Sequence, residues 1–154
     1  MRLELFLPDS AATEALGARL APLVAPGDVV CLRGGLGAGK TTLTRGLISA
    51  LMGAPTDVPS PTFTLVQTYE TRRSLIWHFD LYRLEEDARA PGGGLEELGW
   101  DDTHTGIALV EWPDRAPAQM PPHRLDITLE PTAGARYAAL EPKGEDWQDR
   151  LHGF

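Results

Sequence analysis

The sequence Gly34-Gly35-Leu36-Gly37-Ala38-Gly39-Lys40-Thr41 fits G-x-x-x-x-G-K-S/T, the pattern of a phosphate-binding P-loop. A phosphate needs backbone N–H groups that approach closely, the positive end of a helix and a point charge. The glycines allow the tight wrap, Lys40 is placed to reach the terminal phosphates, and Thr41 offers a hydroxyl to Mg²⁺. Lys40 is also one of only two lysines, against twelve arginines. The stretch predicts a nucleotide-binding protein.

The segments on either side of this stretch strengthen the prediction. An apolar run at 28–32 precedes it, and an amphipathic helical pattern at 42–52 follows, ending at Gly53 and Pro55. A P-loop lies between a strand and a helix, so the setting agrees with the motif. The alternative is a glycine-rich strand-to-helix turn that binds nothing.

Length and composition indicate one globular domain. The 154 residues are 42% apolar and 23% charged, enough for the chain to build its own core. We expect a P-loop ATPase domain at 1–141 and a polar, loosely held tail at 142–154. The single cysteine, Cys31, excludes an internal disulfide and lies in an apolar run, which predicts a buried strand position.

The net charge of −8 bears on the partners of the protein. Proteins that grip nucleic acid directly usually carry a basic face, because neutralising phosphates supplies most of their affinity. The charge therefore argues against this chain as the main nucleic-acid-binding subunit of an assembly, although Arg72-Arg73 and Arg83 could cluster. The sequence predicts neither a membrane-spanning segment nor a signal peptide, and we expect a cytoplasmic protein without a membrane partner.

The remaining pattern predicts alternating strands and helices at first, then hairpins. Ser10 is the expected N-cap of the first helix, and hairpin turns are expected at Arg72-Arg73 and at 131–134. We expect strands at 2–7, 29–33, 63–69, 75–80, 106–110, 124–130 and 136–140, helices at 11–24 and 42–52, a partly helical segment at 81–90, a flexible break at 91–94 and a helical turn at 95–98. The fold class is thus α/β: a single P-loop NTPase domain with a mixed parallel/antiparallel sheet flanked by helices.

Two carboxylates close apolar strands and are candidates for the acid that a P-loop site needs near Mg²⁺. Asp80 ends the run Ile76-Trp77-His78-Phe79-Asp80, and Glu111 ends Ile107-Ala108-Leu109-Val110-Glu111. Either could instead be a surface carboxylate that caps a strand or helix. The sequence does not separate their roles.

The segment Ser60-Pro61-Thr62-Phe63-Thr64 carries hydroxyls on a restrained backbone between the P-loop helix and the next strand. A switch loop that offers an oxygen to Mg²⁺ usually lies there, whereas the alternative is a proline-stiffened connection. Trp112 could stack near a base or pack against the edge of the sheet, and from the sequence alone we favour packing. His78 is expected to be a structural histidine, and the other histidines lack metal-ligand spacing, so a zinc site is not expected.

Five motifs occur together in one order. They are Gly-Gly-Leu-Gly-Ala-Gly-Lys-Thr-Thr (34–42), Ser-Pro-Thr-Phe-Thr-Leu-Val (60–66), His-Phe-Asp-Leu-Tyr-Arg (78–83), Glu-Glu-Leu-Gly (96–99) and Val-Glu-Trp-Pro (110–113). The chain resembles the TsaE family, formerly YjeE, of small bacterial P-loop ATPases. The resemblance runs from about Leu7 to Arg136.

The resemblance implies a role in making the threonylcarbamoyl modification of adenosine beside the anticodon, in tRNAs that read codons starting with A. In that family the protein binds ATP and Mg²⁺, hydrolyses ATP slowly and docks on the TsaB and TsaD proteins, which perform the transfer. The resemblance thus implies that the protein meets tRNA indirectly, through the complex, and the sequence does not say whether it also touches tRNA itself.

The resemblance also implies site residues. Lys40 contacts phosphates, Thr41 ligates Mg²⁺, and Asp80 and Glu111 are the acids at the metal and the catalytic residues. The expected cofactor-binding set is Ser10, Gly35, Leu36, Gly37, Ala38, Gly39, Lys40, Thr41, Thr42, Thr62, Thr64 and Trp112, with Asp9 beside Ser10 near the base or sugar. One departure stands out: Gly35 replaces the acid that is common in the family, which leaves phosphate binding intact and puts hydrolysis in question.

Two other classes of protein use the same loop. A small-molecule kinase needs a lid and an acceptor pocket, and the sequence has no arginine-rich lid segment after the central strands. A nucleotide-gated binding module with negligible hydrolysis is consistent with Gly35.

Overall fold

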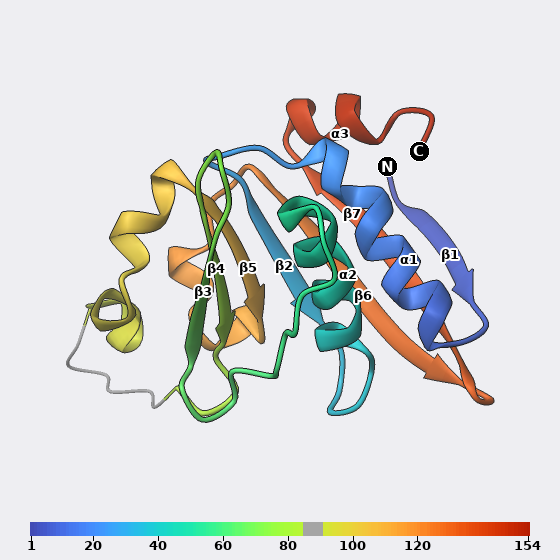
Figure 1. Cartoon of the computed structure of the whole chain (residues 1–154), viewed down its shortest axis with the longest axis horizontal. Helices are drawn as coiled ribbons and strands as arrows, with labels where there is room; N and C mark the ends of the chain where they lie inside the picture. The colour runs from blue at the N-terminus through green and yellow to red at the C-terminus, as the bar shows by residue number, and fades with distance from the viewer. Residues whose placement is uncertain (85–90) are drawn as a thin grey trace.

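The centre of the fold is a mixed sheet (Figure 1). The computed structural model describes residues 1–84 and 91–154. Within them seven strands lie in the order β1-β7-β6-β2-β5-β4-β3. Their bounds are β1 Leu3–Leu7, β2 Val29–Arg33, β3 Val66–Glu70, β4 Leu75–Asp80, β5 Ile107–Glu111, β6 Arg124–Thr132 and β7 Ala135–Lys143.

Parallel pairing is confined to the inner strands. β6, β2, β5 and β4 run parallel, whereas β1–β7, β7–β6 and β4–β3 are antiparallel. Both predicted hairpins, β3–β4 and β6–β7, are therefore confirmed. The predicted fold class, a single α/β domain with a mixed sheet flanked by helices, is confirmed as well.

Helices cover both faces of the sheet. α1 (Ser10–Leu20) and α2 (Lys40–Met52) lie together on one face (Figure 1), with α3 (Glu145–Leu151) at one end. The 3-10 helices are η1 Ala21–Leu23, η2 Pro91–Leu98, η3 Trp100–Thr105, η4 Pro113–Arg115 and η5 Pro117–Gln119. Among the helices of the described residues, none has the length and apolar character needed to cross a membrane.

The sheet separates two hydrophobic cores. Val30 and Leu32 of β2 face the core under α1 and α2, and Val29 and Cys31 face the second core on the other side. A strand buried on both faces reads as a continuous apolar run, as this one does. The predicted burial of Cys31 is confirmed, and burial raises the pKa of its thiol to about 12.

The first two helices differ from the prediction at their ends. The N-cap of α1 is Asp9, not Ser10: its carboxylate accepts the Ala12 N–H at 2.8 Å. α1 stops at Leu20 rather than at residue 24, and Pro22 lies in the 3-10 turn that follows, because proline has no N–H for a helical bond. α2 begins at Lys40, two residues before the predicted start.

Two connecting segments were also predicted wrongly. β3 starts at Val66 and not at 63, because the Leu65 N–H donates to the Pro61 carbonyl at 2.7 Å and closes a turn. Residues 91–94 belong to η2 instead of forming a flexible break, while the helical turn at 95–98 is confirmed. Most of the segment predicted as partly helical, 85–90, lies outside the described residues.

The C-terminal segment is packed and not loosely held as predicted. β7 extends to Lys143, and α3 follows. Trp147 and Leu151, one helical turn apart, are 2% and 1% exposed and join the core under α1. The polar residues around this i, i+4 pair concealed it in the sequence.

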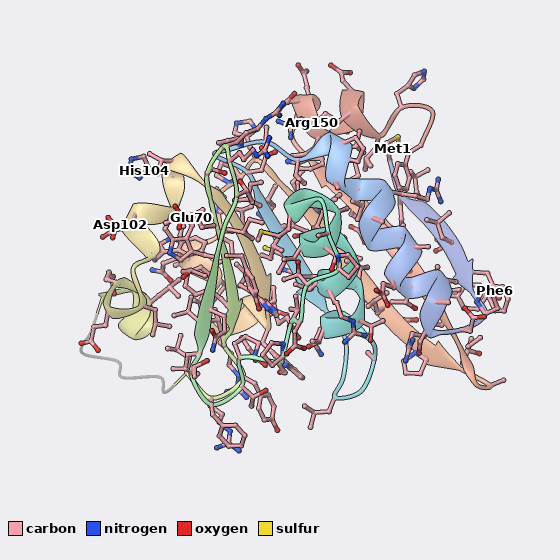
Figure 2. The ribbon with its side chains drawn as sticks, viewed as in Figure 1. Met1, Phe6, Glu70, Asp102, His104 and Arg150 are labelled. Atoms are coloured by element: carbon pink, nitrogen blue, oxygen red, sulfur yellow. The ribbon has the colours of Figure 1, made fainter. Side chains whose placement is uncertain are left out.

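Arg150 fixes α3 to the opposite end of the sheet from the P-loop. Figure 2 labels Arg150 beside α3. Its guanidinium donates to the Leu23 carbonyl at 3.1 Å, pairs with Asp28 and Asp146, and lies 4.4 Å from the centre of the Trp147 ring. Charge-assisted hydrogen bonds of this kind stabilise by about 1.5–3 kcal/mol.

We expect Arg150→Ala to lower the free energy of unfolding by about 2 kcal/mol. Urea denaturation followed by tryptophan fluorescence measures the change. Arg73→Ala, at an exposed arginine in the β3–β4 turn, is the matched control and should stay within about 0.5 kcal/mol of the parent. Equal losses in the two variants would contradict the role of Arg150.

Candidate nucleotide-binding site

The P-loop joins the carboxyl end of β2 to the start of α2. Gly34 and Gly39 have φ of +144° and +104°, a region that residues with a Cβ rarely adopt. A Cβ on Gly34 would lie 2.6 Å from the Leu129 carbonyl oxygen, and one on Gly39 would lie 2.9 Å from Arg136 Nε. Backbone conformation therefore favours glycine at both positions, and the backbone of Leu129 also excludes a Cβ at Gly34, whereas the flexible Arg136 side chain could move away from one at Gly39.

A cavity of about 220 Å³ opens above this loop, where β4 and β5 also end. Its lining holds most of the predicted site residues: Leu36, Gly37, Ala38, Gly39, Lys40, Thr41, Thr42, Thr62, Asp80, Glu111 and Trp112. Ser60 and Arg136, which were not predicted as site residues, complete the lining. Ser10 lines a neighbouring cavity of about 310 Å³, which shares Gly37 and Arg136 with the first. The two cavities therefore adjoin each other at these shared residues.

Two predicted residues lie outside both linings. Gly35 enters the site only through its carbonyl. Thr64 is exposed, and its hydroxyl accepts a hydrogen bond from Gln67 at 3.1 Å. A role for Thr64 at the nucleotide stays a prediction.

A larger groove, of about 730 Å³, lies between α1 and α2. Alanines and glycines dominate its lining, which contains neither the P-loop nor the strand-end carboxylates. Convergent polar groups, rather than size, identify a site for a charged ligand, so the smaller cavities are the better candidates.

Lys40 is held inside the loop that it serves. Its Nζ donates to the carbonyls of Gly34 and Gly35 at 2.6 and 2.8 Å, and lies 4.4 Å from the centre of the Trp112 ring. Burial lowers the pKa of the Lys40 ammonium, and the carboxylates of Glu111 and Asp80 oppose that shift. The ammonium thus lies among acceptors that a phosphate could replace.

Asp80 ties the segment 60–64 to the site. Thr62 Oγ1 donates to Asp80 Oδ2 at 2.9 Å, and Ser60 Oγ does so at 3.3 Å. The Tyr82 N–H donates to the other oxygen, Oδ1, at 3.0 Å. Asp80 and Glu111 are partners in the parallel register of β4 and β5, so the two carboxylates stand side by side.

Glu111 is buried and faces α2. Its Oε2 accepts from Thr41 Oγ1 at 3.2 Å and lies 2.5 Å from His78 Nε2. Trp112 follows with φ of +60°, and this turn lets its ring lie against both Lys40 and Tyr82, whose ring centre is 4.9 Å away. Trp112 therefore contributes packing and also forms a wall of the cavity.

The oxygen atoms at this point suit Mg²⁺. The Thr41 hydroxyl lies within hydrogen-bond distance of Glu111, and Glu111 is paired with Asp80 in the register of β4 and β5. Mg²⁺ takes hard oxygen ligands and usually combines one or two carboxylates with waters and substrate phosphates. Among the described residues no three or more His, Cys, Asp or Glu converge into an all-protein metal cage. The residues fit an ion that is shared with a phosphate.

Arg136 is a site residue that the sequence did not indicate. Its guanidinium packs against Gly39, its Nη1 donates to Thr13 Oγ1 at 3.2 Å, and its side chain lines both cavities. It reaches the loop because β7 pairs with β1 and β6, placing Arg136 opposite Leu7 and Pro131. No local motif marks the residue, so only the strand register reveals it.

A phosphate-binding loop at the carboxyl edge of a parallel sheet, with acids on the neighbouring strands, is the arrangement of P-loop NTPase-like proteins. More specifically, the chain belongs to the TsaE family: residues 7–138 match the family described as "Threonylcarbamoyl adenosine biosynthesis protein TsaE". The family predicted from the five motifs is confirmed.

Individual relatives agree with this assignment. The chain is 42% identical to a Synechocystis sp. protein over 124 residues, covering 77% of this chain and 74% of that protein. It is 37% identical to a Rickettsia felis protein over 127 residues, 82% and 71% of the two chains. Both are named "tRNA threonylcarbamoyladenosine biosynthesis protein TsaE". The crystal structure of Bacillus subtilis YdiB superposes with a TM-score of 0.80 at 28% identity, covering 99% of this chain and 93% of YdiB.

Proposed function

We propose that this protein binds ATP with Mg²⁺ and hydrolyses it slowly, as an accessory subunit that acts with TsaB and TsaD. The reaction it serves is the threonylcarbamoyl modification of adenosine next to the anticodon, in tRNAs that read codons beginning with A. The observation that carries the proposal is the convergence of Lys40, Thr41, Asp80 and Glu111 on one cavity, in a chain of the TsaE family.

Binding replaces contacts that the loop makes with itself. In the structure Lys40 satisfies the carbonyls of Gly34 and Gly35. The phosphates of ATP take over the ammonium, while the N–H groups at the start of α2 face the same anion. The adjoining cavity at Ser10 and Arg136 then receives the sugar and base.

The carboxylates and the metal divide the remaining work. Thr41, Glu111 and Asp80 would hold the ion, which would supply positive charge beside the phosphates when bound. Asp80 also anchors Thr62 and Ser60, so these hydrogen bonds can transmit the state of the nucleotide to the surface of the segment 60–64. Phe63, in that segment, is 80% exposed and is available to a protein partner.

The net charge of −8 supports docking on a protein rather than direct binding of tRNA. The test combines the purified protein with TsaB, TsaD and tRNA, and follows modification over many turnovers. We expect turnover to depend on this protein and on ATP. Undiminished turnover in its absence would contradict the proposal.

A nucleotide-gated module without meaningful hydrolysis is the second candidate. Gly35 carries no side chain, and a Cβ there would meet nothing within 4 Å, so no group at this position orients a water. ATPase rates measured alone and with the partners distinguish the two candidates, because strong binding without hydrolysis in either state favours the module. Phosphorylation of a nucleoside or small metabolite would instead favour a kinase.

We expect Arg136→Ala to weaken ATP binding about tenfold, which corresponds to about 1.4 kcal/mol. The guanidinium stands between the loop and the adjoining cavity, where it meets the nucleotide. Isothermal titration calorimetry measures the affinity, and Arg73→Ala is again the control for a lost positive charge. Unchanged affinity in Arg136→Ala would remove this residue from the site.

A further inference from the structure

His78 is a buried polar residue for which nucleotide binding, as described above, has no use. It lies in β4, and neither it nor Glu111 is accessible to solvent, with 0% and 2% of each residue exposed. The two side chains form a contact of 2.5 Å between His78 Nε2 and Glu111 Oε2.

The sheet register brings the two residues together. His78 pairs with Leu109 across the parallel strands, and Glu111 follows Leu109 by two residues on the same face. Asp80 follows His78 by two residues, so the histidine lies one layer below both strand-end carboxylates. His78 therefore supports the site from inside the protein and does not line the cavity.

The hydrogen bonds assign the proton on the ring. An ionised carboxylate only accepts hydrogen bonds, so Nε2 of His78 donates to Glu111 Oε2. His78 Nδ1 has no hydrogen-bond partner among the described residues. A buried N–H is rarely left without a partner, so the geometry places the ring proton on Nε2.

We propose that His78 is a positioning residue, which fixes the Glu111 carboxylate so that it meets Mg²⁺ together with the Thr41 hydroxyl. The inference rests on the proposed function, because it needs a Mg²⁺–nucleotide complex at this site. Oε2 is held by two donors, His78 Nε2 and Thr41 Oγ1, whereas Oε1 has only a 3.5 Å contact with Thr41. A carboxylate fixed through one oxygen presents the other in a defined direction.

Two substitutions of His78 test whether the hydrogen-bond donor at Nε2, rather than the volume of the ring, is what matters. The amide nitrogen of glutamine reaches the position of Nε2, whereas that of asparagine reaches only the position of Nδ1. We expect His78→Asn to raise the Mg²⁺ concentration needed for half-maximal tightening of ATP binding by about tenfold or more. His78→Gln should stay within about threefold of the parent, and nucleotide affinity without Mg²⁺ should be unchanged in both variants.

A double-mutant cycle tests whether His78 acts through Glu111. In a Glu111→Gln background, His78→Asn should cause no further change in the Mg²⁺ dependence. If His78→Asn changes the Mg²⁺ dependence as much in the Glu111→Gln background as in the parent, the inference is overturned. An unchanged Mg²⁺ dependence in the single variant His78→Asn would overturn it as well. Loss of Mg²⁺-free affinity in both His78 variants would indicate a merely structural role and would also overturn it.

Nitrogen-15 NMR of the nucleotide-free protein tests the contact without any ligand. The His78 ring should carry its proton on Nε2, and its resonances should shift in Glu111→Gln. An unshifted ring would overturn the inference while leaving the proposed function intact. Conversely, a wild-type protein that binds no ATP with or without Mg²⁺ would overturn the proposed function, and the inference with it, even where NMR finds the contact.

Discussion

Lys40→Ala is expected to weaken ATP binding at least ~100-fold, which corresponds to about 2.7 kcal/mol. The ammonium is the only lysine charge at the P-loop, and it lies in a partly buried setting where burial lowers its pKa and water screens it poorly. Alanine removes the charge and leaves the carbonyls of Gly34 and Gly35 without this donor. If the proposed function holds, tRNA modification should fall as well wherever ATP is below the weakened dissociation constant.

The other lysine supplies the matched control. Lys143 ends β7, is 42% exposed, and lies 3.6 Å from Glu141 in a surface pair. A pair of that kind contributes little to stability, so Lys143→Ala should bind ATP like the parent. Calorimetric titration of ATP into both variants, at equal Mg²⁺, gives the comparison. A weakening of less than about threefold in Lys40→Ala would contradict the P-loop assignment.

The contacts that Lys40 makes in the nucleotide-free protein connect the P-loop to the segment 60–64. Its Nζ lies near the Trp112 ring, and that ring packs on Tyr82, whose N–H donates to Asp80. A phosphate that attracts the ammonium therefore changes one end of a contact chain that reaches the acid holding the segment 60–64. Lys40, Trp112, Tyr82 and Asp80 form a continuous physical path from the loop to that segment.

The parts of the site that the sequence predicted are those set by local chain geometry. A P-loop is one continuous segment, so Lys40 and Thr41 could be placed from the motif alone. Asp80 and Glu111 are each the last residue of an apolar strand, and parallel neighbours end at the same edge of the sheet, which brings the two acids together. The two hairpins were likewise predicted from local patterns, namely the alternation of apolar and polar residues and the turn residues between the strands.

The parts that the sequence did not predict depend on tertiary register. Arg136 meets the P-loop because β7 lies between β6, its hairpin partner, and β1, and the pairing of β7 with β1 joins segments far apart in the chain. His78 was predicted to be structural, and its contact with Glu111 needs a diagonal step between two strands. The packing of α3 rests on Trp147 and Leu151, two apolar residues in a polar segment, whose burial is decided by the surface they meet.

Gly46→Ala is expected to lower the free energy of unfolding by about 3 kcal/mol, although alanine favours helices. α1 and α2 cross at two glycines: a Cβ on Gly46 would lie 2.0 Å from the Glu14 carbonyl oxygen, and one on Gly17 would lie 2.1 Å from that of Leu43. Both clashes are with backbone, so the helices must separate. Urea denaturation measures the loss, and Gly17→Ala should show a loss of similar size.

Gly35→Ala is the control for the loss of a glycine as such. A Cβ on Gly35 would meet nothing within 4 Å, and its φ lies outside the left-handed region, so stability should change by less than about 1 kcal/mol. The helix crossing also matters for the site, because α2 begins with Lys40 and α1 begins with Ser10. In folded Gly46→Ala, ATP affinity should therefore fall along with stability. Stability equal to that of the parent would show that the helices separate at no cost, and would contradict the close packing on which the geometry of the site depends.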